Sequence, residues 1–516
     1  MTRSFVLLAA VLTLIGGCAN PRKMVGGYPE ALDHLRMPTA GYSPSASHAD
    51  AQNMDGSHTL DYYVQVALKR NPEILAMESR VAGQAEVVPQ VTALPDPVLS
   101  NTVWPGAPNS PQTASGRMSN NLMVAQQFPW FGKLRLRGEV ADLETRIALT
   151  QLAETHLKIT EAVKASYYEI HFNQEALRIT NENERLLRDY IKFAEVRYTA
   201  GQTSQQDVLR SQVELNKLQD QLIQLNQQLR MSQADLAKLL SISPEADLKA
   251  VKDKDAPPVP DQVDRLYEAA IAARPELQGR LDAIRRDERM VELAKLQYYP
   301  DITVGVNWGA ITTNDALAKT ATGNDNVGLI VAMNLPVWHN KLSAGVRQNQ
   351  NRTVESAKLY DAARDETFRQ IKRYTIQAHS LEQQISLFRK DIIPRADQTL
   401  NVSAADYRTG KVVMLQLIDN WTQLLRFQIQ LARLEAALAQ TIASLERVVG
   451  TELTPLPMSR PQEKKMDMPM SQAPTKIRPG ADGSSGAQTL IPTQARMGAP
   501  EPADRRSVTF RRSYPE

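Results

Sequence analysis

The same short sequence patterns occur twice in this chain, about two hundred residues apart. The sequence pattern of residues 67–74 recurs at residues 270–277, and that of residues 197–201 recurs at residues 406–410. A series of apolar residues spaced three and four positions apart, called the apolar ladder below, also occurs in both copies. Its members are Leu215, Leu218, Leu222, Leu225, Leu229, Leu236 and Leu239, and then Leu424, Phe427, Leu431, Leu434, Leu438, Leu445 and Val448. One structural unit has therefore been duplicated, and the fold must be two-fold repeated.

The first 17 residues have the pattern of a secretion signal. A basic start is followed by an apolar run, residues 5–15, that is too short to span a bilayer. Small residues then precede Cys18, which resembles the bacterial lipobox, where the signal is cut and the thiol is acylated. We therefore predict lipidation of Cys18; the alternative is an ordinary signal peptide with a stray thiol. Because Cys18 is the only cysteine, an internal disulfide and a thiolate metal cluster are excluded.

Composition divides the rest of the chain into a leader, a body and a tail. Residues 18–58 and 454–516 are rich in Pro, Gly and Ser without a period, so we predict an extended leader and a disordered tail. The body comprises two predicted repeats, residues 59–255 and 256–453. Its composition is typical of long helices packed side by side. A net charge of +3 gives no reason to expect a nucleic-acid partner.

Each repeat is predicted to open with a helix and then to change period. The opening helices, residues 60–90 and 262–297, are interrupted near their starts by Pro72 and Pro275. Period-two alternation of apolar with small or polar residues then predicts one β-hairpin in each repeat. The predicted strands are residues 98–104 and 122–128, then 302–308 and 327–335, with polar loops at 105–119 and 309–326.

Very long helices are predicted to follow the hairpins. Residues 134–199 and 342–408 would each span about 100 Å. Gly201 and Gly410 mark sharp turns. The chain then returns in helices of half the length; they are predicted at residues 204–240 and 412–449. A returning helix and an opening helix, placed end to end, match the length of a long helix, and the apolar ladder predicts coiled-coil packing.

The predicted strands indicate a membrane barrel shared between chains. Four strands cannot close a barrel, and lone hairpins are marginally stable in water. Strands with an apolar outer face and a small or polar inner face are typical of transmembrane barrels, which have no open edges. Three chains would supply twelve strands. The alternative is a small soluble sheet that caps a helical bundle.

This order of elements, together with several motifs, resembles the TolC family of outer-membrane efflux channels. The motifs lie at residues 197–201 with 207–209, 407–410 with 417–419, and 335–338, and the resemblance covers residues 60–450. It implies a mostly α fold with transmembrane β-strands: a homotrimer with a 12-stranded barrel and a periplasmic helical coiled-coil barrel. It also implies docking to a periplasmic adaptor (a membrane fusion protein) and an inner-membrane pump of the RND type.

The resemblance also implies two kinds of site at the periplasmic tips. Acidic residues after the turns form a constriction ring in the family, and the corresponding positions here are Asp207, Gln416 and Asp419. The alternative is that both acids are solvated residues favoured by the helix dipole. The adaptor-docking tips correspond to Tyr198, Gly201, Tyr407 and Gly410. The glycines would also supply the positive φ that such turns require.

Two features hint at heavy-metal cargo. Residues 130–133 resemble a form common among channels that serve heavy-metal efflux pumps. The tail residues Met466, Met468 and Met470 offer thioethers that suit Cu(I) or Ag(I), although short Met runs are often accidental. No histidine pair has H-x-x-x-H spacing, so we predict no bound metal and no cofactor.

We therefore expect a lipid-anchored outer-membrane channel that extends into the periplasm and conducts substrate passively from its pump and adaptor. The sequence contains no phosphate loop and no nucleophile elbow, and it has no cysteine in its body, so we predict that it is not an enzyme. Two alternatives stay open. One is a type I protein secretion channel, and the other is a periplasmic structural coiled-coil lipoprotein.

Overall fold

A computed structural model describes residues 56–105, 110–251, 262–314 and 316–453. Several predicted features fall outside these residues: the signal peptide, the Cys18 lipidation site, most of the leader, and the tail that contains Met466 to Met470. All described residues belong to one compact unit of the chain.

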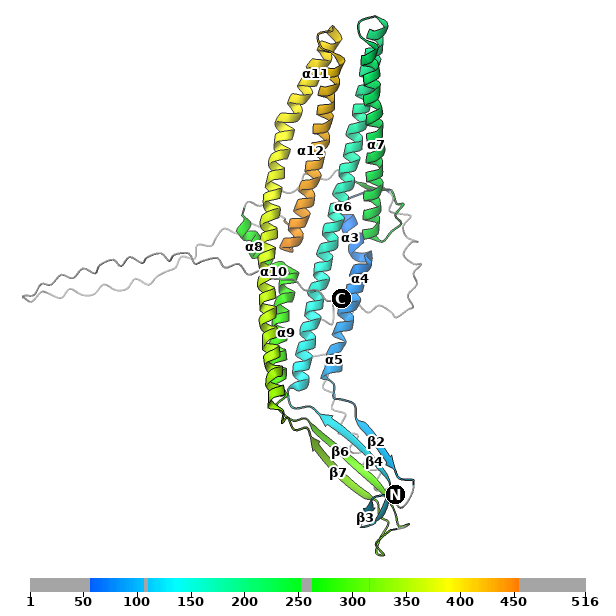
Figure 1. Cartoon of the computed structure of the whole chain (residues 1–516), viewed down its shortest axis with the longest axis vertical. Helices are drawn as coiled ribbons and strands as arrows, with labels where there is room; N and C mark the ends of the chain where they lie inside the picture. Colours follow the sequence, from blue (N-terminus) through cyan, green and yellow to red (C-terminus); the bar gives the residue numbers. More distant parts are fainter. Residues whose placement is uncertain (1–55, 106–109, 252–261, 315, 454–516) are drawn as a thin grey trace, which may run out of the picture. The chain divides into compact units, whose positions relative to one another are not determined.

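The body is mostly helical, and its two halves contain the same main elements in the same order. The first half contains α3 (Leu60–Arg70), α4 (Pro72–Ala85), α5 (Val87–Thr92), β2 (Val98–Val103), β3 (Gln112–Thr113), β4 (Gly116–Phe128), α6 (Lys133–Thr199) and α7 (Gln205–Leu240). The second half contains α8 (Val263–Ala273), α9 (Pro275–Leu296), β6 (Ile302–Thr312), β7 (Asn326–Met333), α10 (His339–Leu387), the π-helix η4 (Phe388–Ile392), α11 (Ile393–Thr409) and α12 (Met414–Val449). Figure 1 shows the long helices with the strands at one end and the hairpin turns at the other.

The two predicted proline breaks are confirmed. Pro72 and Pro275 are the first residues of α4 and α9, where a missing N–H costs no helical hydrogen bond. Asn71 caps α4 by accepting a hydrogen bond from the Glu73 N–H at 2.9 Å. The first opening helix contains one break more than predicted, because α5 begins separately at Val87.

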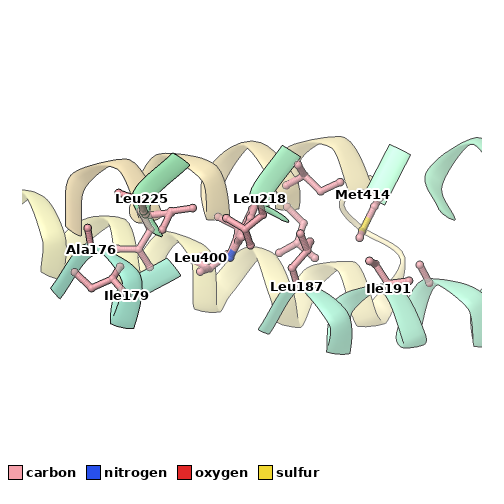
Figure 2. Packing of buried hydrophobic residues seen from close by; sticks show 14 of the residues in the cluster. Ala176, Ile179, Leu187, Ile191, Leu218, Leu225, Leu400 and Met414 are labelled. Carbon is pink, nitrogen blue, oxygen red and sulfur yellow. The ribbon is translucent and has the colours of Figure 1, made fainter. Parts of the chain in front are cut away.

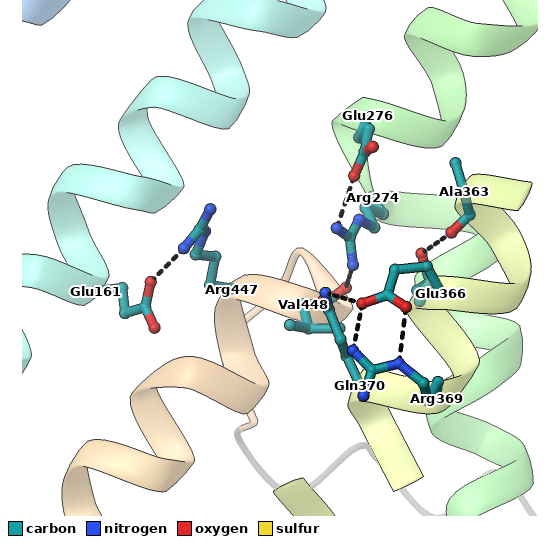
Figure 3. Close-up of polar contacts among 10 residues, drawn as sticks. Glu161, Arg274, Glu276, Ala363, Glu366, Arg369, Gln370, Arg447 and Val448 are labelled. Atoms are coloured by element: carbon teal, nitrogen blue, oxygen red, sulfur yellow. Dashed lines mark hydrogen bonds and ion pairs between the residues drawn. The ribbon is translucent and has the colours of Figure 1, made fainter. Parts of the chain in front are cut away.

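The returning and opening helices meet end to end, as predicted. Asn71 Nδ2 donates to the Leu239 carbonyl near the end of α7 at 3.0 Å. Arg274 Nη1 donates to the Val448 carbonyl near the end of α12 at 3.2 Å, and the same guanidinium bonds Glu276. Figure 3 shows this second junction. Each junction supplies a donor to a carbonyl in the last turn of a helix, where helical donors are missing.

The prediction of the first long helix is confirmed, and the second long segment is helical over the predicted residues but contains one π-helical turn. Helix α6 is unbroken from Lys133 to Thr199. The second long segment is interrupted by η4, because Pro394 in its path lacks an N–H and its ring clashes with the preceding helical turn. The sequence prediction overlooked this proline.

The strands form one antiparallel sheet in the order β2-β4-β6-β7, and β3 pairs with β4 beside this path. The four predicted strands are confirmed, but two are longer than predicted. Strand β4 begins at Gly116 inside the predicted loop, and β6 continues to Thr312. A register shift between Met118 and Asn120 accommodates an extra residue where these two strands pair.

A short parallel pair of strands was not predicted. Strand β1 (Gly56–His58) pairs with β5 (Leu248–Ala250). The Tyr63 hydroxyl donates to the Lys249 carbonyl at 3.1 Å, which attaches this pair to α3. Strands of three residues are too short for a period-two pattern to be visible in the sequence.

Candidate functional site

The two helical hairpins end in tips of the same backbone geometry. Gly201 and Gly410 have φ values of 70° and 80°, a backbone conformation that residues with a side chain rarely adopt. In the first tip, the Gln202 N–H donates to the Arg197 carbonyl at 2.9 Å. In the second, the Lys411 N–H donates to the Asp406 carbonyl at 2.9 Å. These are the wide-turn bonds that end a helix at a left-handed glycine, so both glycines are located where the sequence predicted a turn.

One arginine joins the two tips. Arg197, at the end of α6, donates through Nη1 to the Tyr407 carbonyl in the last turn of α11. Its Cζ lies 4.9 Å from the centre of the Tyr407 ring, which is a cation–π contact. A side chain at position 410 would place a Cβ 3.3 Å from Arg197 Nη2, so glycine leaves room for the guanidinium. Sequence reasoning included Arg197 in a motif but assigned it no role.

The two tyrosines predicted as docking residues lie in different environments. Tyr198 is 44% exposed, whereas Tyr407 is only 3% exposed and packs edge-on against Phe193 at 5.9 Å. Burial raises the pKa of the Tyr407 phenol, and the nearby Asp207 carboxylate adds to this shift, while Arg197 opposes it. In the single chain, Tyr198 therefore offers its side chain to a partner, and Tyr407 belongs to the contact between the hairpins.

The predicted gate residues lie on two different helices. Asp207 is half-buried in the first turn of α7 and accepts a hydrogen bond from the Thr203 hydroxyl. Gln416 and Asp419 are both exposed near the start of α12. The single chain thus brings Asp207 close to Tyr407 of the other hairpin, and it leaves Gln416 and Asp419 of α12 at the surface.

A large apolar cluster packs the two hairpins together next to their tips. It contains buried residues of α6, α7, α11 and α12, and Figure 2 shows residues such as Ile191, Leu218, Leu400 and Met414 converging between the helices. Trp421 is the largest of its members and is 2% exposed. Because both hairpins contribute to this cluster, a change in their separation would expose apolar surface, which costs free energy.

The sheet has two faces of opposite character. Register places on one face an apolar set, most of it exposed: Leu99, Val103, Leu122, Val124, Phe128, Ile302, Val304, Val306, Trp308, Val327, Leu329, Val331 and Met333. The other face includes Asn121, Asn307 and Gly328. A Cβ at Gly328 would lie 2.3 Å from Asn307 Oδ1, so the polar ladder on this face requires a glycine there. Such a broad exposed apolar face marks an interaction surface.

A buried ion pair joins the sheet to the long helix. Lys133, the first residue of α6, is 1% exposed, and its Nζ donates to Asp301 at 2.7 Å and to the Tyr299 carbonyl at 3.0 Å. Asp301 also accepts from the Trp130 N–H at 2.8 Å. Burial alone would raise the pKa of Asp301, but the bonds from Lys133 and Trp130 outweigh it and lower that pKa. The Trp130 ring stacks on Tyr299 with centres 5.2 Å apart.

Neither a metal site nor a helical membrane span is found among the described residues. In that part of the chain, no three His, Cys, Asp or Glu side chains are grouped so that they could hold a metal ion. Across the same residues, every helix is too short or too polar to cross a lipid bilayer.

Comparisons with known proteins agree with this geometry. The sequence profile of the outer membrane efflux protein family matches the chain twice, over residues 63–241 and 266–451. The pyoverdine export outer membrane protein OpmQ of Pseudomonas putida is 21% identical over 479 residues, which cover 87% of this chain and 97% of that protein.

Solved structures share the same fold at low sequence identity. CusC is 16% identical with a TM-score of 0.66, and the match covers 80% of this chain and 97% of CusC. The outer membrane protein VceC of Vibrio cholerae is 18% identical with a TM-score of 0.63, covering 77% of this chain and 97% of VceC.

Proposed function

The chain belongs to the outer membrane efflux protein family, and we propose that it is the outer-membrane channel of a tripartite efflux system. Members of this family transport and do not catalyse, so the chain is not an enzyme. The observation that carries the proposal is the double family match on a body whose sheet has two open edges and one apolar face. Substrate would pass passively from an inner-membrane pump through this conduit to the exterior.

In this proposal, three copies of the chain close one barrel. Strands β2 and β7 are the edges of the sheet, and each has backbone groups on its outer side that need a partner strand. Lipid cannot satisfy these groups, so a membrane location requires closure by further copies. Three four-stranded sheets would give twelve strands, with the apolar face toward lipid and the face with Asn121 and Asn307 toward the lumen. The helices would continue the barrel as a periplasmic tunnel.

We further propose that residues 59–255 and 256–453 are two copies of one unit, with residues 18–58 as a leader and 454–516 as a tail after removal of residues 1–17. The double family match and the common order of elements support this division. The exposed tip residue Tyr198 and the turns at Gly201 and Gly410 would dock the periplasmic adaptor, which connects the channel to a pump of the RND type.

The relatives favour a small cargo over a protein. The proposed cargo is drugs or heavy-metal ions, and the name of OpmQ, for export of pyoverdine, favours efflux over type I protein secretion. The pump selects the cargo in such an arrangement, because the channel has only to conduct it.

Lipidation at Cys18 can be separated from barrel insertion by one variant. We expect Cys18→Ser to lose incorporation of a labelled fatty acid and yet to stay in the outer-membrane fraction after alkaline washing, because twelve strands in lipid hold more firmly than acyl chains. The control is the wild-type chain, which should keep both the label and the location. Release of the unlipidated protein by the wash would instead favour a periplasmic scaffold that only its lipid anchors.

The proposed gate consists of acidic rings at the tips. Three copies of Asp207 and of Asp419 around a narrow axis would attract cations and restrict flow. We expect Asp207→Ala with Asp419→Ala to raise single-channel conductance in planar bilayers and to reduce cation preference. Asp235→Ala, which removes an exposed acid near the other end of α7, is the control and should change neither quantity. Unchanged conductance and selectivity in the double variant would remove the gate assignment.

The number of chains in the assembly can be tested by measuring its mass. Native mass spectrometry of detergent-extracted protein should give a trimer. A monomer would contradict the shared barrel, because a four-stranded sheet alone cannot close.

A further inference from the structure

The buried ion pair between Lys133 and Asp301 joins the two halves of the body. Lys133 begins the long helix that follows β4, and Asp301 immediately precedes β6, the strand that pairs with β4. The pair therefore links the end of a strand in the first half to the start of a strand in the second half. Because the two halves contain the same main elements in the same order, both residues should have counterparts one repeat away.

The counterpart of Lys133 is Lys341. Residues 130–134 (WFGKL) recur as residues 338–342 (WHNKL), an offset of 208 (133 to 341). Buried positions further along the two long helices keep this offset: they are Ile159, Val163 and Tyr167 in α6, and Thr367, Ile371 and Thr375 in α10. Lys341 thus follows β7 at the start of α10, as Lys133 follows β4 at the start of α6.

The counterpart of Asp301 is Asp96. Each acid follows a proline, between the last opening helix of its half and the first strand of that half. Their offset of 205 (96 to 301) also aligns Leu99 of β2 with Val304 of β6, and both lie on the apolar face of the sheet. The offsets of the acid and the lysine differ because the connections between these elements differ in length.

In the single chain, Asp96 and Lys341 lie at opposite edges of the sheet. Strands β2 and β7 are the edges, and β4 and β6 lie between them (Figure 1). Three steps of about 4.8 Å separate the two edges by about 14 Å, whereas an ion pair needs a separation of about 4 Å or less. Both side chains are exposed, and among the residues that the structure describes neither has an ion-pair partner.

The apolar residues beside these two charges are also uncovered. In the buried site, the Trp130 ring stacks on Tyr299, and the Trp130 N–H bonds Asp301. At the offset of 208, Trp130 corresponds to Trp338, which is 74% exposed. At the offset of 205, Tyr299 corresponds to Leu94, which is 41% exposed. Each edge of the sheet therefore presents one charge and one large apolar side chain, and the two edges are complementary.

We propose that Lys341 of one copy pairs with Asp96 of the next copy, in the same way as Lys133 pairs with Asp301 within a chain. The inference rests on the proposed channel function, because it requires that β7 of one copy meets β2 of the next in a shared barrel. Trp338 then packs against Leu94 of the next copy and covers the pair. The site is incomplete in one chain, and it is completed three times in a trimer.

The pair also fixes the register of the strands at the contact between copies. Two edge strands can slip past one another by two residues without moving any side chain to the other face of the sheet. Such a slip shifts the strands by about 6.6 Å, which separates Lys341 from Asp96. A charge left buried without its partner is strongly unfavourable, so only one register is stable.

A double-mutant cycle tests whether the two charges act as a pair. Lys341→Met and Asp96→Asn should each lower the fraction of trimer at a fixed concentration in detergent several-fold, and the double variant should be no worse than either alone. Circular dichroism would check that each chain is folded. The control is Arg347→Met, which replaces an exposed cation further along α10; it should have little effect alone and should add to Asp96→Asn. Effects of the two site variants that multiply, or no effect of either, would contradict the pairing.

Cross-linking tests the position of the contact. Chains with Asp96→Cys, co-expressed with chains that contain Lys341→Cys, should form covalent dimers with a short bismaleimide, which spans the length of a lysine side chain as a disulfide does not. Each variant alone keeps Cys18 and should form none, and Arg347→Cys in place of Lys341→Cys is the matched control. Native mass spectrometry of the same sample separates the two failures. A trimer without this cross-link would overturn the site and leave the proposed channel standing, whereas a monomer would contradict both.

Discussion

Replacing Lys133 by methionine should lower the free energy of unfolding by about 3–5 kcal/mol, because it removes one partner of a buried ion pair. Methionine keeps most of the length of the side chain but donates to neither Asp301 nor the Tyr299 carbonyl. The carboxylate would then stay at the junction between α6 and β6 without its cation. The measurement is the denaturant midpoint of the detergent-solubilised protein, followed by its tryptophan fluorescence; Trp130, which bonds the same carboxylate, is one of the five tryptophans that contribute to it.

The chain offers a matched control for this variant two residues further along. Arg135 pairs with Glu139 on the surface of α6, with Arg135 58% exposed, so Arg135→Met should cost at most about 1 kcal/mol. The effect at Lys133 should also depend on pH. Asp301 has a lowered pKa in the folded chain, so its ionised form stabilises the fold. This contribution to the free energy of unfolding is complete above the unfolded pKa of about 3.9, and it is lost as pH falls through the folded pKa. Equal midpoints for the two variants at neutral pH would show that the buried pair does not hold the junction.

Replacing Arg197 by alanine should raise the ratio of open to closed channels by about tenfold or more. A hydrogen bond from a charged donor contributes about 1.5–3 kcal/mol, and each 1.4 kcal/mol is a factor of ten in an equilibrium constant. The variant removes both the bond to the Tyr407 carbonyl and the contact with its ring. Single-channel recording in planar bilayers would measure the open probability.

Two further variants separate this effect from charge alone. Arg197→Lys keeps the charge but loses the planar fork, so it should open the channel part of the way. Arg188→Ala removes an exposed arginine that pairs with Glu184 on the same helix, and it should leave the open probability unchanged. An Arg197→Ala channel as closed as the wild type would show that the contact between the tips does not hold the gate shut.

Much of the fold could be predicted because glycine, proline and apolar periodicity act locally. Gly201 and Gly410 turn the chain where the sequence placed the turns, and Pro72 and Pro275 begin new helices. The strands were visible from period-two alternation, although the start of β4 was not, since its first residues lack a clear pattern.

The features that sequence reasoning missed depend on long-range contacts. Lys133 follows an aromatic pair and a glycine, and nothing in the local sequence shows that Asp301, far along the chain, makes its burial possible. Tyr198 and Tyr407 occupy the same place in one motif, yet only the second is covered, because Arg197 lies over its ring. The π-helix η4 lies within the second long helix just before Pro394, and an apolar pattern with steps of three and four residues does not show such a change of hydrogen bonding.

The central claim is that three copies of this chain form one gated channel, and conductance in a planar bilayer tests it most directly. Detergent-extracted protein, with its mass first checked, would be added to one side of the membrane. The account predicts a trimer that gives discrete steps of low conductance, which grow when Arg197 or the tip carboxylates are replaced. A monomer that gives no steps would contradict the barrel, the tunnel and the gate together.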